Sequence, residues 1–270
     1  MSFKQAILGT FVGRAATQIR DTAELVRLAV TTPEGVGTLL NDQLATRLVT
    51  GLRCRTFVDV GAHIGSVIAQ AQYRTGAKVI AIEAMPDKAV ALTRKFPGVK
   101  VHACAVGNAT GDVSFFVTPA ATGYSSLIRS PNAVEIVVPL RRLDDLIEER
   151  VDIVKIDVEG AELGVLQGAE RTVRESRPVI MFESSFEEKL YSKDAMFSWL
   201  NDRNYHILAP DRMAHDGPAF SREGFAEAHW YPRRCTNYFA VPAERRTEVR
   251  ELARQTLGRP CQVARLGTQS

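Results

Sequence analysis

Apolar residues from about residue 55 onward fall into two alternating patterns. Short runs rich in β-branched residues are typical of buried strands, and they are expected at 55–61, 78–84, 99–107, 112–117, 133–139, 151–159, 178–184, 204–210 and 237–242. Segments with apolar residues at helical spacing lie between them, at 66–74, 86–96, 143–149, 161–176 and 195–203. This alternation predicts an α/β domain whose mostly parallel sheet is covered by helices on both faces. The strands at 112–117 and 133–139 are expected to form a hairpin-like insert.

The pattern divides the chain into three parts. Residues 1–51 form an N-terminal helical extension with helices expected at 3–31 and 37–50, residues 52–242 form the main domain, and residues 243–270 form a helical tail. The simplest interpretation of the extension is that it packs on the domain behind it. A substrate lid, a dimer contact or a helix in peripheral contact with a membrane surface are the alternatives.

Composition adds little to this picture. The chain has 270 residues, 45% hydrophobic and 24% charged, and its net charge of +3 favours neither an anionic nor a cationic partner. Its four cysteines are scattered and have no metal-ligand spacing, which indicates reduced thiols in a cytoplasmic protein. No apolar run approaches the ~20 residues that cross a bilayer, and no signal peptide is predicted.

Acidic residues stand at the carboxyl ends of four predicted strands, where ligands bind in open α/β sheets. They are Asp59, Glu83, Asp157 with Glu159, and Glu183. Any one of them is explained by a helix cap or an ion pair, but so many acids on one edge indicate a ligand with positive charge and hydroxyl groups. S-adenosylmethionine, with its sulfonium, amino group and ribose, has this chemistry.

A glycine turn follows the first strand. Gly61 permits a sharp turn and a close approach of ligand, and Gly65 opens the next helix. Asp59 precedes this turn and would repel a phosphate, so it favours an amine-bearing ligand. Glu83, about twenty residues after the turn, suits ribose hydroxyls, and the small residues at 104–107 suit an adenine pocket.

The chain resembles the FkbM-type methyltransferases, which are S-adenosylmethionine-dependent enzymes of class I. The matching segments are FVDVGAHIG, VIAIEAMPD, ACAVGNATGDVSF, the GYSSL loop, VPLRRLDDLI, VDIVKIDVEGAELGVLQGAE, RPVIMFE and TNYFAVP, in order over residues 55–242. The resemblance implies a doubly wound, mostly parallel, seven-strand Rossmann-like sheet with an antiparallel last strand. It also implies a set of cofactor-binding residues: Asp59, Gly61, Ala62, His63, Gly65, Glu83, Ala84, Ala105 and Asp157.

The catalytic candidates are Asp157, Glu159 and His63. By the resemblance, Asp157 stands beside the transferable methyl group, and Asp157 or Glu159 would accept the proton of a hydroxyl. In an extended chain these two acids share one face. His63 stands where the family usually has Asn, which indicates a positive φ first and a base second. Asp157, Glu159 and Glu183 would alternatively hold Mg²⁺ or Ca²⁺, although a divalent metal is not favoured.

The family's typical acceptors are hydroxyls of sugars, glycans and secondary metabolites. The candidate acceptor-binding residues are Tyr124, Ser125, Glu183, Trp230 and Arg233. The loop 211–236 carries several of the aromatic and basic residues that bind sugars or phosphates. The alternative is that this loop is plain surface with Trp230 in the core.

Three rival functions remain open on the sequence. An NAD-dependent oxidoreductase also uses a glycine turn and an acid, but the G-x-G-x-x-G pattern is absent. A non-catalytic scaffold that binds S-adenosylmethionine is the second rival. Nucleic-acid methylation is the third, and it is disfavoured because acids alternate with arginines along the tail, as on a solvated helix. No nucleic-acid partner is therefore predicted, and the sequence does not indicate an oligomeric state.

Overall fold

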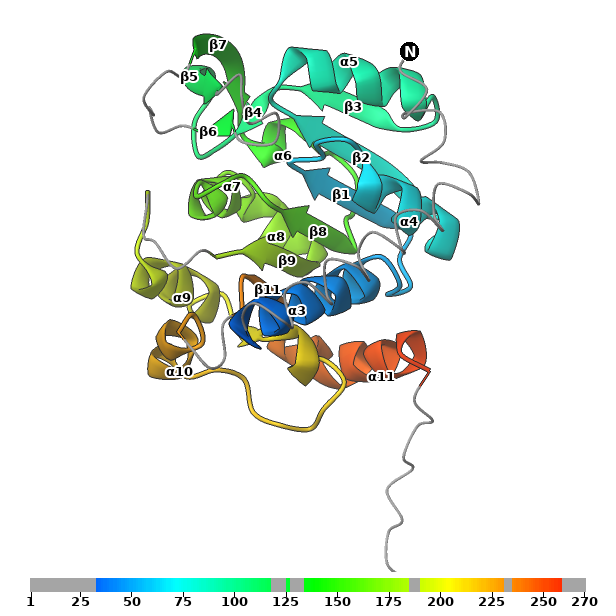
Figure 1. Ribbon diagram of the computed structural model, residues 1–270, viewed down its shortest axis with the longest axis vertical. Coiled ribbons are helices and arrows are strands. Elements are labelled where there is room, and N and C mark those ends of the chain that lie inside the picture. Colours follow the sequence, from blue (N-terminus) through cyan, green and yellow to red (C-terminus); the bar gives the residue numbers. More distant parts are fainter. Residues whose placement is uncertain (1–32, 118–124, 127–133, 185–189, 231–234, 259–270) are drawn as a thin grey trace, which may run out of the picture.

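A seven-stranded sheet forms the centre of the computed structural model (Figure 1), which describes residues 33–117, 125–126, 134–184, 190–230 and 235–258. The strand order is β10-β11-β9-β8-β1-β2-β3. Their bounds are Thr56–Val60 for β1, Lys78–Glu83 for β2, Lys100–Ala103 for β3, Ile153–Ile156 for β8, Val179–Glu183 for β9, Tyr205–Leu208 for β10 and Asn237–Pro242 for β11. Only β11 runs antiparallel to its neighbours in this sheet. The predicted fold class is confirmed.

Helices cover both faces of the sheet because successive strand residues point to opposite sides. Val58 and Val60 of β1 belong to one core cluster, with residues of α7 (Glu162–Gln167), α8 (Glu170–Ser176) and α9 (Lys193–Asn201). Phe57 belongs to the other cluster, with residues of α3 (Pro33–Val49), α4 (Ser66–Thr75), α5 (Pro86–Lys95) and α11 (Arg246–Thr256).

The described part of the N-terminal extension packs on the domain, as its simplest interpretation predicts. Leu48 and Val49 of α3 are fully buried and share a cluster with Val249 and Ala253 of α11. The two helices lie side by side on the sheet (Figure 1). The predicted helix at 3–31 lies outside the described residues. No helix in the described ranges is long and apolar enough to cross a membrane.

A smaller four-stranded sheet, in the order β4-β7-β5-β6, stands beside the edge of the main sheet (Figure 1). It consists of β4 (Ala105–Val106), β5 (Gly111–Val117), β6 (Ser125–Ser126) and β7 (Val134–Arg141). The predicted hairpin is confirmed, since β5 and β7 pair antiparallel. The strand expected at 99–107 is instead divided at Cys104, with β3 in the main sheet and β4 in the smaller one.

The single helix expected at 161–176 is two helices, and Gly168 lies at the break. A Cβ on Gly168 would come within 1.9 Å of the Gly107 carbonyl oxygen. The Gly168 carbonyl also accepts a hydrogen bond from the Asp144 amide (3.0 Å). Gly168 therefore packs closely on the backbone of Gly107, as only glycine can, at the point where the helix is broken.

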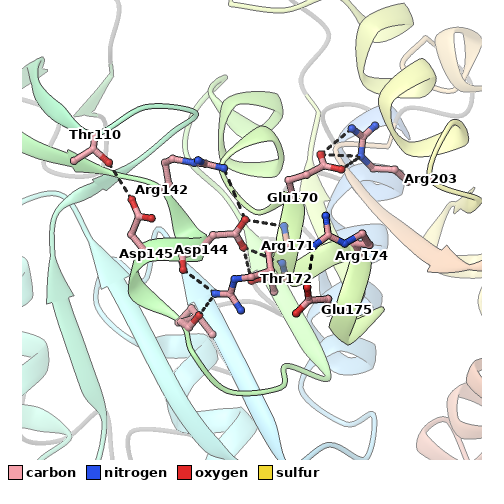
Figure 2. Close-up of polar contacts among 11 residues, drawn as sticks. Thr110, Arg142, Asp144, Asp145, Glu170, Arg171, Thr172, Arg174, Glu175 and Arg203 are labelled. Atoms are coloured by element: carbon pink, nitrogen blue, oxygen red, sulfur yellow. Dashed lines mark hydrogen bonds and ion pairs between the residues drawn. The ribbon is translucent and has the colours of Figure 1, made fainter.

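Asp144 of α6 (Leu143–Leu146) then caps the second of these helices, α8. Its carboxylate accepts hydrogen bonds from the amides of Arg171 (2.7 Å) and Thr172 (2.8 Å) and from the Thr172 hydroxyl (2.7 Å). Figure 2 shows this network, in which the Arg171 guanidinium also donates back to the Asp144 carbonyl. The LDDL segment of the sequence therefore has a structural role, as an N-terminal cap supplied from another element.

The stretch 211–236 is less irregular than the sequence predicts. Its described residues include the end of a 3₁₀ turn, Pro210–Arg212, and the short helix α10 (Arg222–Glu227), which begins at Ser221. Phe225 of α10 is fully buried and stacks edge-on against Tyr238 of β11, with ring centroids 4.9 Å apart. One apolar anchor thus fixes α10 on the sheet.

Candidate active site

A cleft of about 290 Å³ opens at the carboxyl ends of β1, β2 and β8. This is the edge at which open α/β sheets bind ligands. Its lining includes these predicted residues: Gly61, Ala62, His63, Glu83, Ala84, Ala105, Asp157 and Glu159. The topology therefore gathers residues that lie as far as 98 positions apart in the sequence.

The turn after β1 is fixed by backbone contact with the end of β8. Gly61 has φ +80°, and a Cβ there would lie 1.9 Å from the Asp157 carbonyl oxygen. His63 has φ +48°, which confirms the positive φ predicted for it. Gly65, also at positive φ, begins α4 and packs against Phe96 rather than lining the cleft.

Glu83 holds the turn and faces the cleft at once. One carboxylate oxygen accepts the His63 amide (2.8 Å), and the other accepts the Met85 amide (2.9 Å). The residue is 6% exposed. Because a carboxylate oxygen has two lone pairs, both oxygens keep one acceptor position for hydroxyl groups of a ligand.

An apolar wall stands beside Glu83. It includes Ala105, as predicted, together with Cys104, Val106 and Phe115. Phe115 is 8% exposed and comes from β5 of the smaller sheet. The sequence marks it only as one apolar residue of the insert, so its place in the cleft depends on how the second sheet folds back.

Lys155 is the main site residue absent from the prediction. It is 5% exposed and lies in the middle of β8, yet it lines the floor of the cleft. Its ammonium donates to the Gly61 carbonyl (2.9 Å) and contacts the carboxylates of Asp59 (3.2 Å) and Asp157 (3.3 Å). Burial alone would lower the pKa of Lys155, but the charges of Asp59 and Asp157 outweigh it and raise that pKa. The lysine is therefore charged.

This arrangement changes the interpretation of Asp59. The sequence favours a cationic ligand beside it, whereas the structure places the carboxylate at 0% exposure, below the cleft and against Lys155. A buried carboxylate needs a partner, and here a side chain of the same chain supplies it. A charged residue in the apolar run IVKI is the signal from which Lys155 can be found.

Asp157, Glu159 and Glu183 come together as predicted, with ligand atoms within 4.8 Å of one another. Burial and the adjacent charge of Asp157 raise the pKa of Glu183 to about 9. Burial would also raise the pKa of Asp157, but Lys155 and a hydrogen bond with Glu183 outweigh it and lower that pKa. At neutral pH Glu183 therefore holds a proton and donates it in a hydrogen bond to the ionised Asp157.

The grouping does not come from an extended chain. Strand β8 ends at Ile156, and Glu159 and Gly160 both have positive φ, at +55° and +102°. Buried Glu162 holds this loop by accepting the amides of Val158 (3.3 Å) and Gly160 (3.0 Å). A left-handed turn, rather than alternation along a strand, thus brings Glu159 beside Asp157.

The predicted acceptor residues are placed less completely. Trp230 is 59% exposed, so it belongs to the surface and not to the core. Its neighbour His229 is buried and bonds the Ser184 hydroxyl (2.9 Å) just beyond β9. Tyr124 and Arg233 lie outside the described residues, and for Ser125 only the backbone is described, in β6.

Comparison with known proteins gives consistent matches. The family model described as the methyltransferase FkbM domain matches residues 59–207. Methyltransferase sdnD of Sordaria araneosa is 30% identical, over 42% of this chain and 60% of that one. Among solved structures, methyltransferase FkbM of Methylobacillus flagellatus KT has 20% identity and a TM-score of 0.44, covering 69% of this chain and 43% of that one. Magnesium protoporphyrin IX methyltransferase of Synechocystis PCC 6803, with bound SAM, has 12% identity and a TM-score of 0.41, and the match covers 76% of this chain and 79% of that one.

These relatives are longer than the matched region. The chain spans 60% of the length of the curated relative and 43% of the FkbM structure. The roles of individual residues therefore rest on the geometry of the cleft.

Proposed function

Because the chain belongs to the methyltransferase FkbM domain family, we propose that it is an S-adenosylmethionine-dependent methyltransferase that acts on a hydroxyl group. The observation that carries this proposal is the order of groups along the cleft. Glu83 and an apolar wall stand on the β2 side of the Gly61 turn, and Asp157 and Glu159, with Glu183 next to them, stand on the β8 side.

The residues of the cleft fit the cofactor. Glu83 has acceptor positions for the ribose hydroxyls, Ala84, Ala105 and Phe115 offer a wall for the adenine, and the backbone of the 61–63 turn suits the methionine part. When bound, S-adenosylmethionine supplies an electrophilic methyl group on its sulfonium. Glu83 is preorganised for binding, since two backbone amides already fix its carboxylate.

Asp157 is the proposed proton acceptor. A hydroxyl is a poor nucleophile until its proton leaves, and an ionised carboxylate at the edge of the cleft can take it. Glu183 is unsuited to this role at neutral pH because its raised pKa keeps it protonated. Glu159 and His63, which also line the cleft, are the alternative bases.

The test of the cofactor site is calorimetry with S-adenosylhomocysteine on a Glu83→Ala variant. Loss of hydrogen bonds to a charged acceptor, at ~1.5–3 kcal/mol each, predicts at least tenfold weaker binding. Asp87→Asn is the matched control, because Asp87 is an exposed acid four residues later that does not line the cleft. Equal affinity in wild type and Glu83→Ala would place the ribose elsewhere, and tighter binding of NADH than of S-adenosylhomocysteine would favour the oxidoreductase.

The test of the base is Asp157→Asn, assayed on a hydroxyl acceptor found by screening. We expect kcat to fall ~10²–10⁴-fold with the fold intact. The same acid group has the ligand atoms of a Mg²⁺ or Ca²⁺ site, but the Lys155 ammonium already contacts the Asp157 carboxylate as a cation. We therefore expect chelator to leave wild-type turnover unchanged. Near-normal turnover of Asp157→Asn would make His63 the leading candidate.

We propose that the acceptor binds beside exposed Trp230. Trp230 offers an aromatic face of the kind that stacks on sugars. Tyr124, Ser125 and Arg233 are proposed to complete this side. Neutralising Arg233 should raise the acceptor KM and leave the affinity for S-adenosylhomocysteine unchanged, and loss of cofactor binding would refute its assignment.

A further inference from the structure

Lys155 joins three separate segments at the floor of the cleft. Its partners are a side chain within β1, the carbonyl of the turn after β1, and the carboxylate just beyond β8. The ammonium donates a hydrogen bond to the Gly61 carbonyl and forms ion pairs with the carboxylates of Asp59 and Asp157. These three partners all belong to the chain itself, although Lys155 lines the cleft.

We propose that Lys155 is a positioning residue, whose ammonium ties the cofactor-binding turn at Gly61 to the Asp157 carboxylate and so fixes the distance between them. This inference rests on the proposed function. The β1–β8 register supports it, because Asp59 and Lys155 are directly paired across the two strands. Lys155 thus enters the site from a rigid, fully buried part of the sheet, as a precise positioning group should.

The backbone already brings the two ends of this link into contact. The Asp157 amide donates to the Val60 carbonyl (3.1 Å), and the Gly61 α-carbon packs against the Asp157 carbonyl. These contacts set the main chain, whereas the Asp157 side chain, which is 43% exposed, is held by its side-chain partners Lys155 and Glu183. Of these two partners, Lys155 is the one that also binds the Gly61 carbonyl, so its ammonium directs the Asp157 side chain toward the turn.

The charge of Lys155 also decides the ionisation of Asp157. The titratable groups around Asp157 include mostly acids: Asp59 from β1, Glu83 from β2, His63 from the turn, Glu183 from β9, Glu159 from the loop after β8, and Asp42 from α3. Without the ammonium, an anion at Asp157 would face these acids with one cation fewer. Its proton would then be held to a higher pH.

The experiment measures the titration of the Asp157 carboxyl by ¹³C NMR in the full chain, with the signal assigned through Asp157→Asn. The variant is Lys155→Met, which keeps the length of the side chain and removes its charge. Asp59→Asn is the contrast, because it removes the structural partner of Lys155 but keeps the contact of Lys155 with Asp157. Lys78→Met is the control, since Lys78 pairs with Glu149 at the exposed start of β2.

We expect the Asp157 titration to move to higher pH in Lys155→Met, and to stay at or below its wild-type position in Asp59→Asn and Lys78→Met. We also expect S-adenosylhomocysteine to bind roughly tenfold more weakly to Lys155→Met, because the turn loses a charged donor. An unmoved Asp157 titration, or equal shifts in Lys155→Met and Asp59→Asn, would reduce Lys155 to a partner of Asp59 and overturn the proposal.

Lys155→Met leaves the buried Asp59 carboxylate without its cation and can unfold the chain. In that event the same measurements are made on the double variant Asp59→Asn/Lys155→Met, which removes both charges. An Asp157 titration at higher pH than in Asp59→Asn supports the proposal, and an equal titration overturns it. Failure of the proposed function has a different signature. Wild-type protein would then not bind S-adenosylhomocysteine, while the NMR titration of Asp157 in wild type and Lys155→Met would still test the contact between Lys155 and Asp157.

Discussion

Replacement of Gly61 by alanine tests whether the turn after β1 and the end of β8 are one unit. Gly61 has φ +80°, and the new methyl carbon would lie 1.9 Å from the Asp157 carbonyl oxygen and 2.9 Å from its carbon. Both atoms are backbone, just beyond the end of β8, so neither can move away as the end of a flexible side chain can. The clash must shift the turn, or Asp157, or both.

Two costs add at this position. A left-handed backbone costs an L-residue about 1–2 kcal/mol, and forcing an extra carbon into a packed site costs about 1–3 kcal/mol. We therefore expect Gly61→Ala to lower the free energy of unfolding by about 2–5 kcal/mol. Gly76 separates the two costs, because it has φ +65° and a Cβ added there would have no atom within 4 Å. Gly76→Ala should therefore lower the free energy of unfolding only by the cost of the left-handed backbone, about 1–2 kcal/mol.

Urea unfolding of both variants, together with Gly98→Ala, provides the measurement. Gly98 has open space around it and a φ outside the left-handed region, so its substitution should be close to neutral. S-adenosylhomocysteine binding should weaken in Gly61→Ala alone, since only this methyl displaces the proposed binding turn. If Gly61→Ala is no less stable than Gly76→Ala and binds as the wild type does, the turn is not packed on Asp157 as described.

Two further predictions concern acids elsewhere in the fold. Burial and the charge of Asp157 raise the pKa of Glu183 from 4.5 to about 9, so between these pH values the folded chain keeps a proton that the unfolded chain has released. The free energy of unfolding should therefore fall as pH rises from about 5 to 9. Urea unfolding at several pH values should show this slope in the wild type and a flatter slope in Glu183→Gln. Asp144→Ala removes the cap of α8 and should lower the free energy of unfolding by about 2–3 kcal/mol, measured by thermal unfolding. Asp145→Ala removes only a surface hydrogen bond from the Thr110 hydroxyl and should lower it by less than about 1 kcal/mol. Equal losses in the two variants would refute the capping role.

The order of the elements was predictable because buried strands and helices place apolar residues at regular spacings in the sequence. Strands buried on both faces are continuous apolar runs, and β11 was located at its observed bounds, 237–242. The edge that holds the site was predictable for a related reason. In a parallel sheet the carboxyl ends of strands lie together, so Glu83 and Asp157 had to meet at one edge, although they are 74 positions apart.

Contacts that depend on register were not predictable in the same way. Asp59 and Lys155 are paired across β1 and β8, and a shift of one residue would send Lys155 to the opposite face. The break at Gly168 likewise depends on the approach of Gly107 from another element. Neither pairing leaves a periodic signal, since each is a single contact between distant segments.

The charges at this edge also determine what kind of recognition the cleft can provide. On the sequence alone, the acidic residues of the cleft predict that it attracts a cationic ligand. In the fold, Lys155 offsets one of the two carboxylate charges of Asp59 and Asp157, Glu183 holds a proton, and two amides hold the Glu83 carboxylate in place. Part of the negative charge is therefore offset within the chain, and the fixed acceptor positions of Glu83 and the shape of the Gly61 turn add recognition that does not depend on the charge of the sulfonium. S-adenosylhomocysteine, which shares the ribose, adenine and amino-acid groups but lacks the sulfonium charge, is for this reason a suitable probe of the site.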